Sequence, residues 1–178
     1  FRYTDLAWDG KVSAGRSFSL DQKIYRRRLR LLVVSPSGVV LFLGKDPGFI
    51  GLKTLGKCDI DIKCVVTEKR KYNEKILKCT SSRRLPVLDA GDVRREEFPS
   101  RLLSFNALTG LSLSFPYMLS KKVIEAFPGG VLNCHPARLP QNRGRLPTVW
   151  PILECDRQAH YTLHVMNEQI DAGPIVDV

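Results

Sequence analysis

The chain has 178 residues, of which 43% are hydrophobic and 26% charged, which suits one folded domain and excludes global disorder. Its five cysteines form no CxxC pair, which favours a reduced intracellular protein over a disulfide scaffold. No apolar run approaches the roughly 18 residues that a membrane-spanning helix needs, so no membrane partner is expected.

The net charge of +10 is concentrated at the start of the chain. Residues 1–30 hold eight Lys and Arg against three Asp and no Glu. Their net charge is therefore +5, which is half of the excess positive charge of the chain. We therefore expect residues 1–36 to form a basic N-terminal extension that is solvated or disordered. Nucleic-acid contact and a mitochondrial transit segment are the alternatives. The expected location is cytoplasmic, with the mitochondrial matrix as the alternative.

From Val39 onwards, patterns typical of strands and helices alternate along the chain. The run VVLFLG at 39–44 is continuously apolar, as buried parallel strands are, and helical spacing of apolar residues follows it. The predicted strands are 39–44, 59–67, 85–89, 110–115, 130–135 and 160–167, and the predicted helices are 49–57, 73–84, 120–127 and 148–155. This alternation predicts an α/β fold with a mainly parallel sheet flanked by helices, and no element is predicted within residues 90–109.

A parallel sheet also predicts where a ligand would bind. In open α/β sheets ligands bind beyond the carboxyl ends of the strands. Four segments that follow predicted strands are therefore expected at one rim, namely 44–48, 114–119, 133–140 and 167–174.

Two kinds of site are weakly supported. Gly44 and Gly48 follow the first strand, but the motif G-x-G-x-x-G is absent, so no nucleotide cofactor is expected. Cys155, His160 and His164 have spacing that could supply three metal ligands. We interpret them instead as a packed thiol and a half-exposed strand histidine, and expect no metal.

A cysteine nucleophile is the next alternative. Cys134 lies between Asn133 and His135 at the end of a predicted strand. Successive strand residues point to opposite faces, so Cys134 should face away from its neighbours and behave as a packed thiol.

Asn133 and His135 share one face of this strand, and Asp171 follows 36 residues after His135. An amide donor, a histidine and a carboxylate that orients it form a set suited to acyl chemistry. A capped strand end is the structural alternative for the Asn-x-His pair.

Four segments in order resemble the folate-dependent formyltransferases. NCHPARLPQNRG is similar to the family pattern N-x-H-P-S-x-L-P followed by R-G, with Ala137 in place of Ser. YTLHVMNEQIDAGPIV is similar to its strand followed by D-x-G, SFPYMLS to its pterin loop, and VLFLGKDPGFIGLKTL to its first strand, loop and helix. The resemblance covers residues 39–178 and implies a Rossmann-like catalytic domain like the N-terminal domain of methionyl-tRNA formyltransferase.

The resemblance also implies a donor and a set of site residues. The donor would be 10-formyltetrahydrofolate, with no metal. Asn133, His135 and Asp171 would be the catalytic residues. The folate would lie against five residues, Tyr117, Met118, Leu119, Asn167 and Glu168.

The acceptor would be an amine on a phosphate-bearing molecule, bound near Gly44, Arg138, Arg143, Gly144 and Arg145. The first loop, GKDPGF, resembles the tRNA and amino-sugar branches of the family more than the purine branch, and the positive charge favours methionyl-tRNA. An amino-sugar nucleotide is the alternative acceptor, which Trp150 favours unless this side chain packs in the core.

The family domain continues past Val178, so we expect a catalytic domain that is incomplete at its C-terminus. A non-catalytic, truncated folate- or RNA-binding remnant is the alternative of another class.

Overall fold

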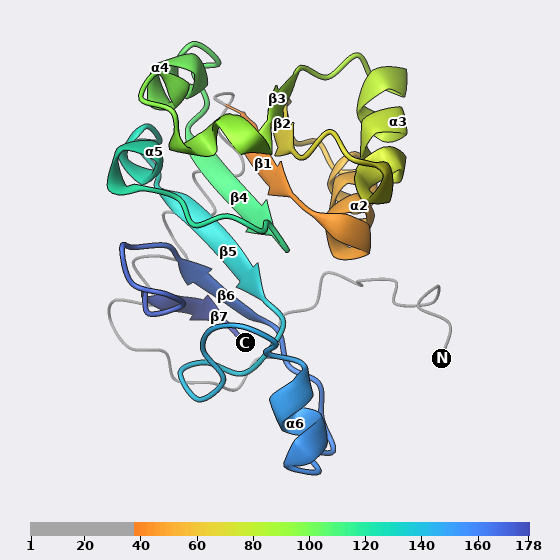
Figure 1. The fold of residues 1–178 in the computed structure, drawn as a ribbon, viewed down its shortest axis with the longest axis vertical. Coiled ribbons are helices and arrows are strands. Elements are labelled where there is room, and N and C mark those ends of the chain that lie inside the picture. The colour runs from red at the N-terminus through yellow and green to blue at the C-terminus, as the bar shows by residue number, and fades with distance from the viewer. Residues whose placement is uncertain (1–37) are drawn as a thin grey trace.

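The computed structural model describes residues 38–178, so the expected basic extension at 1–36 lies outside the described residues. A seven-stranded sheet with the order β3-β2-β1-β4-β5-β6-β7 runs through this part of the chain (Figure 1). The strands are β1 Val39–Leu43, β2 Ile62–Thr67, β3 Val87–Asp89, β4 Thr109–Leu113, β5 Val131–His135, β6 Thr162–Val165 and β7 Ile175–Asp177. Strands β1 to β5 pair in parallel and β6 and β7 antiparallel, which confirms the predicted mainly parallel α/β fold.

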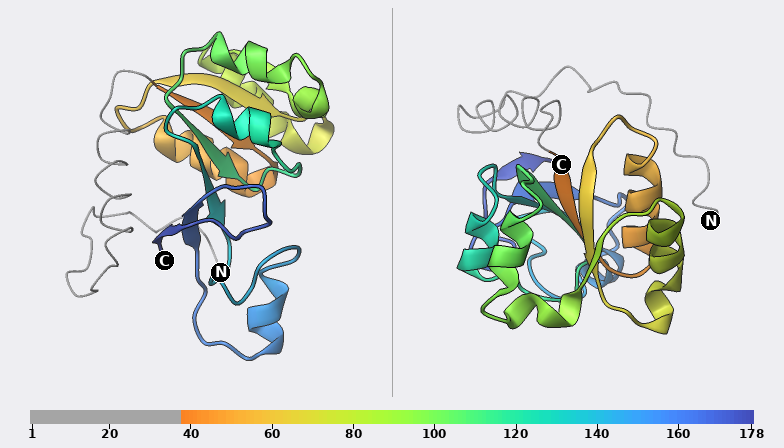
Figure 2. Two further views of the ribbon diagram at one scale, coloured as in Figure 1. Left: turned by 90° about the vertical axis from the view of Figure 1, so that its left-hand side faces the viewer. Right: turned by 90° about the horizontal axis from the view of Figure 1, so that it is seen from above.

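Helices cover both faces of the parallel part of the sheet (Figure 2). Val39, Leu41 and Leu43 of β1 pack in one apolar cluster, and Val40 and Phe42 pack in the other. This alternation buries both faces and explains the continuous apolar run. The helices are α2 Lys45–Leu55, α3 Glu74–Ser82, α4 Phe98–Leu103, α5 Lys121–Glu125 and α6 Val149–Leu153, and the 3-10 turns are η1 Lys71–Asn73 and η2 Ala90–Arg94.

Residues 90–109, within which no element is predicted from the sequence, contain η2 and α4. Phe98 and Leu102 of α4 are four residues apart, so they share a face, and both are buried against the sheet. The helix was missed because it is only six residues long and follows a charged stretch. Ser120 caps α5 by accepting a hydrogen bond from the backbone N–H of Val123.

The last two strands, β6 and β7, are antiparallel to their neighbours, and this direction determines where the residues after β6 lie. Strand β6 runs antiparallel to β5, with Thr162 opposite His135 and Val165 opposite Leu132. The segment that follows β6 therefore starts at the opposite end of the sheet, so the expectation that this strand ends at the common rim is wrong. The chain returns through a tight turn in which a Cβ on Gly173 would collide with the carbonyl oxygen of Val165.

Candidate active site

Strand β5 places Asn133 and His135 on one face of the sheet, between β4 and β6. His135 is 4% exposed, and Asn133 is half-buried. Cys134 between them is also half-buried, and burial raises the pKa of its thiol. A raised pKa keeps the sulfur protonated at neutral pH, as expected for a packed thiol rather than a nucleophile.

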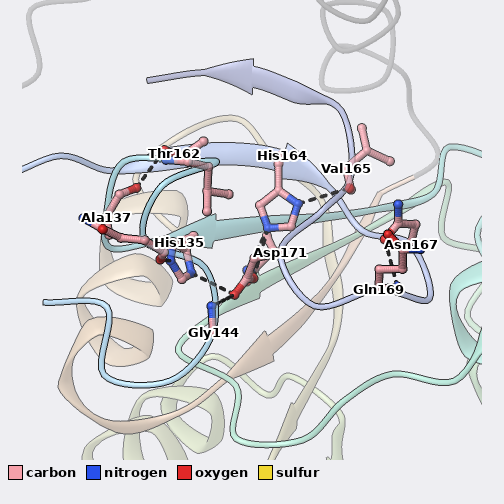
Figure 3. Close-up of polar contacts among 12 residues, drawn as sticks. His135, Ala137, Gly144, Thr162, His164, Val165, Asn167, Gln169 and Asp171 are labelled. Atoms are coloured by element: carbon pink, nitrogen blue, oxygen red, sulfur yellow. Dashed lines mark hydrogen bonds and ion pairs between the residues drawn. The ribbon is translucent and has the colours of Figure 1, made fainter. Parts of the chain in front are cut away.

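The carboxylate of Asp171, in the β6–β7 connection, contacts both Asn133 and His135. Figure 3 shows its contacts with His135 and with the backbone of Gly144. Its Oδ1 accepts a hydrogen bond from Asn133 Nδ2 at 3.3 Å. Its Oδ2 accepts one from the backbone N–H of Gly144 at 3.0 Å and lies 3.4 Å from His135 Nδ1. Asp171 has a φ of 47°, a strained backbone conformation for a residue other than glycine. The structure thus brings the three predicted catalytic residues together.

The surroundings of Asp171 favour its ionised form. Burial by itself raises the pKa of this carboxyl group. A hydrogen bond from His164 when its ring is protonated, the hydrogen bond from the Gly144 N–H, and the positive charges of the protonated His135 and His164 rings outweigh burial and hold the pKa below its ordinary value of 3.8. At neutral pH the group is a carboxylate that can only accept hydrogen bonds.

His135 is held at both nitrogens. Its Nε2 lies 2.7 Å from the carbonyl oxygen of Asn142. A carbonyl oxygen only accepts, so Nε2 carries the hydrogen, and Nδ1 faces Asp171. Asn142 belongs to the loop between β5 and α6, residues 136–148, which covers the imidazole.

The covering loop is itself tied to β6 by Thr162 (Figure 3). The Thr162 hydroxyl donates to the carbonyl oxygen of Ala137 at 2.7 Å and accepts from the N–H of Leu139 at 3.2 Å. Thr162 is fully buried, so these bonds are shielded from water. The anchor fixes the first residues of the loop beside the catalytic residues.

His164 is the site residue that sequence reasoning missed. The expectation of a half-exposed histidine is wrong, because the residue is 2% exposed and contacts both Asn133 and Asp171. The alternation in β6 did place Thr162 and His164 on one face. Because both side chains are polar, this face was expected to meet solvent, yet His164 on it contacts Asn133 and Asp171. His164 lies directly opposite Asn133 in the β5–β6 pairing, and this register is the signal that could have identified it as a site residue.

A pocket opens between the loop after β4 and the β6–β7 connection, and two of the three predicted catalytic residues, Asn133 and Asp171, line it. Of the predicted folate-binding residues, Tyr117, Met118, Leu119 and Asn167 line it. The lining also contains Ser112, Phe115, Pro116, Asn133, His164, Met166, Gln169, Ile170 and Asp171. Glu168 lies outside this lining; its side chain is 63% exposed and 3.4 Å from the Lys121 ammonium.

The predicted acceptor-binding residues lie around this centre. Arg138, Arg143 and Arg145 are exposed on the 136–148 loop, and the Gly144 N–H is bonded to Asp171. Gly44 lies between β1 and α2, and a Cβ there would collide with the carbonyl oxygen of Ser114, so glycine lets these two backbone segments approach.

Within residues 38–178, no group of three or more His, Cys, Asp and Glu is placed to hold a metal ion. His160 faces Asp156 at 3.9 Å. Cys155 is exposed just after the end of α6, so the expectation that it is a packed thiol is wrong. Trp150 is 50% exposed on α6 rather than packed in the core. None of the helices within the described part of the chain is both long and apolar enough to cross a membrane.

Comparison with known proteins places this geometry in context. Residues 37–178 match the family model described as formyl transferase. Among solved structures, phosphoribosylglycinamide formyltransferase from Bacillus halodurans is 18% identical with a TM-score of 0.65, covering 77% of this chain and 75% of that one. The enzyme of the same name from Anaplasma phagocytophilum is 22% identical with a TM-score of 0.65, covering 77% of this chain and 67% of that one. At these identities the structures show a shared fold.

Proposed function

The chain belongs to the formyl transferase family, and on that premise we propose that it transfers a formyl group from 10-formyltetrahydrofolate to an amine. The observation that carries the proposal is the convergence of Asn133, His135 and Asp171 beside one pocket. These side chains come from two segments 36 residues apart, and they supply an amide, an imidazole and a carboxylate.

The pocket next to the catalytic residues suits the donor. Its wall after β4 is held in place because the Tyr117 hydroxyl donates a hydrogen bond of 2.7 Å to Glu68. Apolar side chains such as Phe115 and Met166 stand beside polar ones such as Asn167. A flat ring system with hydrogen-bonding edges, such as the pterin, fits this mixed lining. Tyr117, Met118, Leu119 and Asn167 would hold it, with Glu168 at the margin.

In the proposed reaction the acceptor amine attacks the formyl carbon, and negative charge develops on the formyl oxygen. Asn133 and protonated His135 would donate hydrogen bonds to that oxygen. A preorganised donor of this kind is worth roughly 3 kcal/mol of the barrier. Asp171 would hold the His135 ring and take part in removing the proton from the amine, directly or through a water. The tetrahedral intermediate would then collapse, the bond from the formyl carbon to N10 of the folate would break, and tetrahydrofolate would leave with a proton on N10.

The loop contact of His135 adds one requirement to this mechanism. Its Nε2 hydrogen is bonded to the carbonyl oxygen of Asn142. For His135 to reach the formyl oxygen through Nε2, the bound substrates must displace that carbonyl oxygen. We therefore expect the 136–148 loop to shift when donor and acceptor are bound.

For the acceptor, we propose an amine on a phosphate-bearing molecule, with methionyl-tRNA as the first candidate. Arg138, Arg143 and Arg145 are exposed on the loop that covers His135, where they could meet phosphates. The similar structures are phosphoribosylglycinamide formyltransferases, which makes phosphoribosylglycinamide the second candidate. An amino-sugar nucleotide remains the alternative to which the exposed Trp150 points.

The test supplies the protein with 10-formyltetrahydrofolate and each acceptor separately, and identifies the formylated product by mass spectrometry. We expect one acceptor to be formylated much faster than the others. Donor binding without transfer to any of the three would instead support the non-catalytic, folate-binding remnant.

A further inference from the structure

Three polar atoms meet beside the pocket in a nearly equilateral triangle. Nε2 of His164 lies 3.1 Å from Nδ2 of Asn133 and 3.4 Å from Oδ1 of Asp171. The third side, from Asn133 Nδ2 to Asp171 Oδ1, is 3.3 Å. One imidazole nitrogen therefore contacts both an amide and a carboxylate to which the proposed function assigns catalytic roles.

The other nitrogen of His164 determines how these atoms share their hydrogens. Nδ1 lies 3.1 Å from the carbonyl oxygen of Val165, which can only accept, so Nδ1 carries a hydrogen. In the neutral ring Nε2 is then an acceptor. The Asn133 amide has two hydrogens, one for Nε2 and one for the Asp171 carboxylate. This assignment gives a hydrogen bond to each of the two sides that include Asn133. The third side, from His164 Nε2 to Asp171 Oδ1, then joins two acceptors without a hydrogen bond, and at 3.4 Å it is the longest of the three.

Burial and backbone register make His164 hard to replace by water. The residue is 2% exposed, and it lies directly opposite Asn133 in the β5–β6 pairing. The sheet therefore fixes the ring beside the amide, and solvent has little room to take its place. Without a partner at this position, the Asn133 amide would lose a hydrogen bond in a water-poor environment and could rotate.

We propose that His164 is a positioning residue for formyl transfer, one that holds the Asn133 amide while its other hydrogen turns to the formyl oxygen. The inference rests on the proposed function. In the structure Asn133 gives its hydrogens to His164 at 3.1 Å and to Asp171 at 3.3 Å. The substrate would compete for the second, while the bond to His164 keeps the amide plane in place.

Two substitutions separate positioning from packing. His164→Gln supplies a side-chain oxygen that can still accept from Asn133, whereas His164→Leu fills the space without an acceptor. We expect His164→Leu to lower kcat on the order of a hundredfold, as misplaced catalytic groups do, with a small change in the donor KM. His164→Gln should recover most of that loss. His160→Gln, on a residue outside the site, is the matched control and should retain the wild-type rate.

A second measurement needs neither substrate nor activity. Nitrogen NMR of the substrate-free protein should show His164 with hydrogen on Nδ1, and Asn133→Leu should shift the Nε2 resonance of His164. A hydrogen on Nε2 instead, or an Nε2 resonance that ignores Asn133→Leu, would overturn the arrangement.

The two measurements separate failure of this inference from failure of the proposed function. A wild-type protein that formylates its acceptor, together with a folded His164→Leu variant of equal kcat, would overturn the positioning role alone. Equal losses in His164→Leu and His164→Gln would also overturn it, because they would show a packing effect. A wild-type protein without formyl transfer would overturn the proposed function and the positioning role together, and the NMR result would then concern the arrangement only.

Discussion

Nδ1 of His135 lies 3.4 Å from Oδ2 of Asp171, although 36 residues separate them in the sequence. Strand β5 carries the histidine, and the connection that returns from β6 carries the aspartate. The antiparallel β6 takes the chain away from His135, and the connection that follows it returns and places Asp171 beside the imidazole. The centre is therefore built by the topology of the sheet edge rather than by a local motif.

The first prediction concerns acid stability and Asp171. The native environment lowers the pKa of this carboxyl group, so the ionised form favours the folded state. That contribution is fully present above the unfolded-state pKa and is lost as the pH falls through the lower, native pKa. Urea unfolding at neutral and acidic pH should show a larger loss of stability in the wild type than in Asp171→Asn. Asp61→Asn, on an exposed side chain beside Lys63, is the control and should behave like the wild type. Equal pH dependence in the wild type and Asp171→Asn would contradict the description of this carboxylate.

The hydrogen bond between Tyr117 and the buried Glu68 gives the second prediction. This bond raises the pKa of Tyr117, and it ties the pocket wall to the end of β2. Tyr117→Phe should weaken binding of the folate donor, by roughly tenfold at most for one ordinary hydrogen bond. Titration of the donor by fluorescence would measure this change. Tyr72→Phe, on a residue that is 52% exposed, should leave the affinity unchanged, and equal affinities for all three proteins would refute the role of this bond.

The third prediction tests α4, the helix that the sequence pattern did not indicate. Leu102 is 1% exposed and its neighbour Leu103 is 58% exposed. Leu102→Ala should lower the free energy of unfolding by about 2–5 kcal/mol, because it leaves a cavity against the sheet. Leu103→Ala should change it by less than about 0.5 kcal/mol. Comparable losses in the two variants, measured by urea unfolding, would show that α4 does not pack as described.

The loop arginines give the fourth prediction, which addresses the acceptor. Arg143→Ala with Arg145→Ala should raise the acceptor KM and leave kcat nearly unchanged, because both side chains are exposed and belong to the loop over the centre. With tRNA as the acceptor, affinity should also fall steeply with salt, less so in the double variant. Arg94→Ala, on the exposed side of η2, serves as the control. A salt-independent KM would point to a small acceptor rather than tRNA.

Much of the fold could be predicted, because continuous apolar runs such as β1 identify strands buried on both faces. Antiparallel pairing leaves no comparable local signal, so the direction of β6 and the short edge strand β7 were not predictable. The period of two placed Asn133 and His135 on one face. The same period could not show that the polar side chain of His164 is buried. It also could not show that Nε2 of His135 contacts the backbone carbonyl oxygen of Asn142.

The most direct test of the proposed mechanism is the single-turnover rate of formyl transfer in three site variants, Asn133→Ala, His135→Ala and Asp171→Asn. We expect each rate to fall by a factor on the order of a hundred or more, while the donor still binds through the pocket wall after β4, which none of the three substitutions changes. His160→Ala should transfer at the wild-type rate. A wild-type rate in His135→Ala or in Asp171→Asn would contradict the assignment of this centre to formyl transfer.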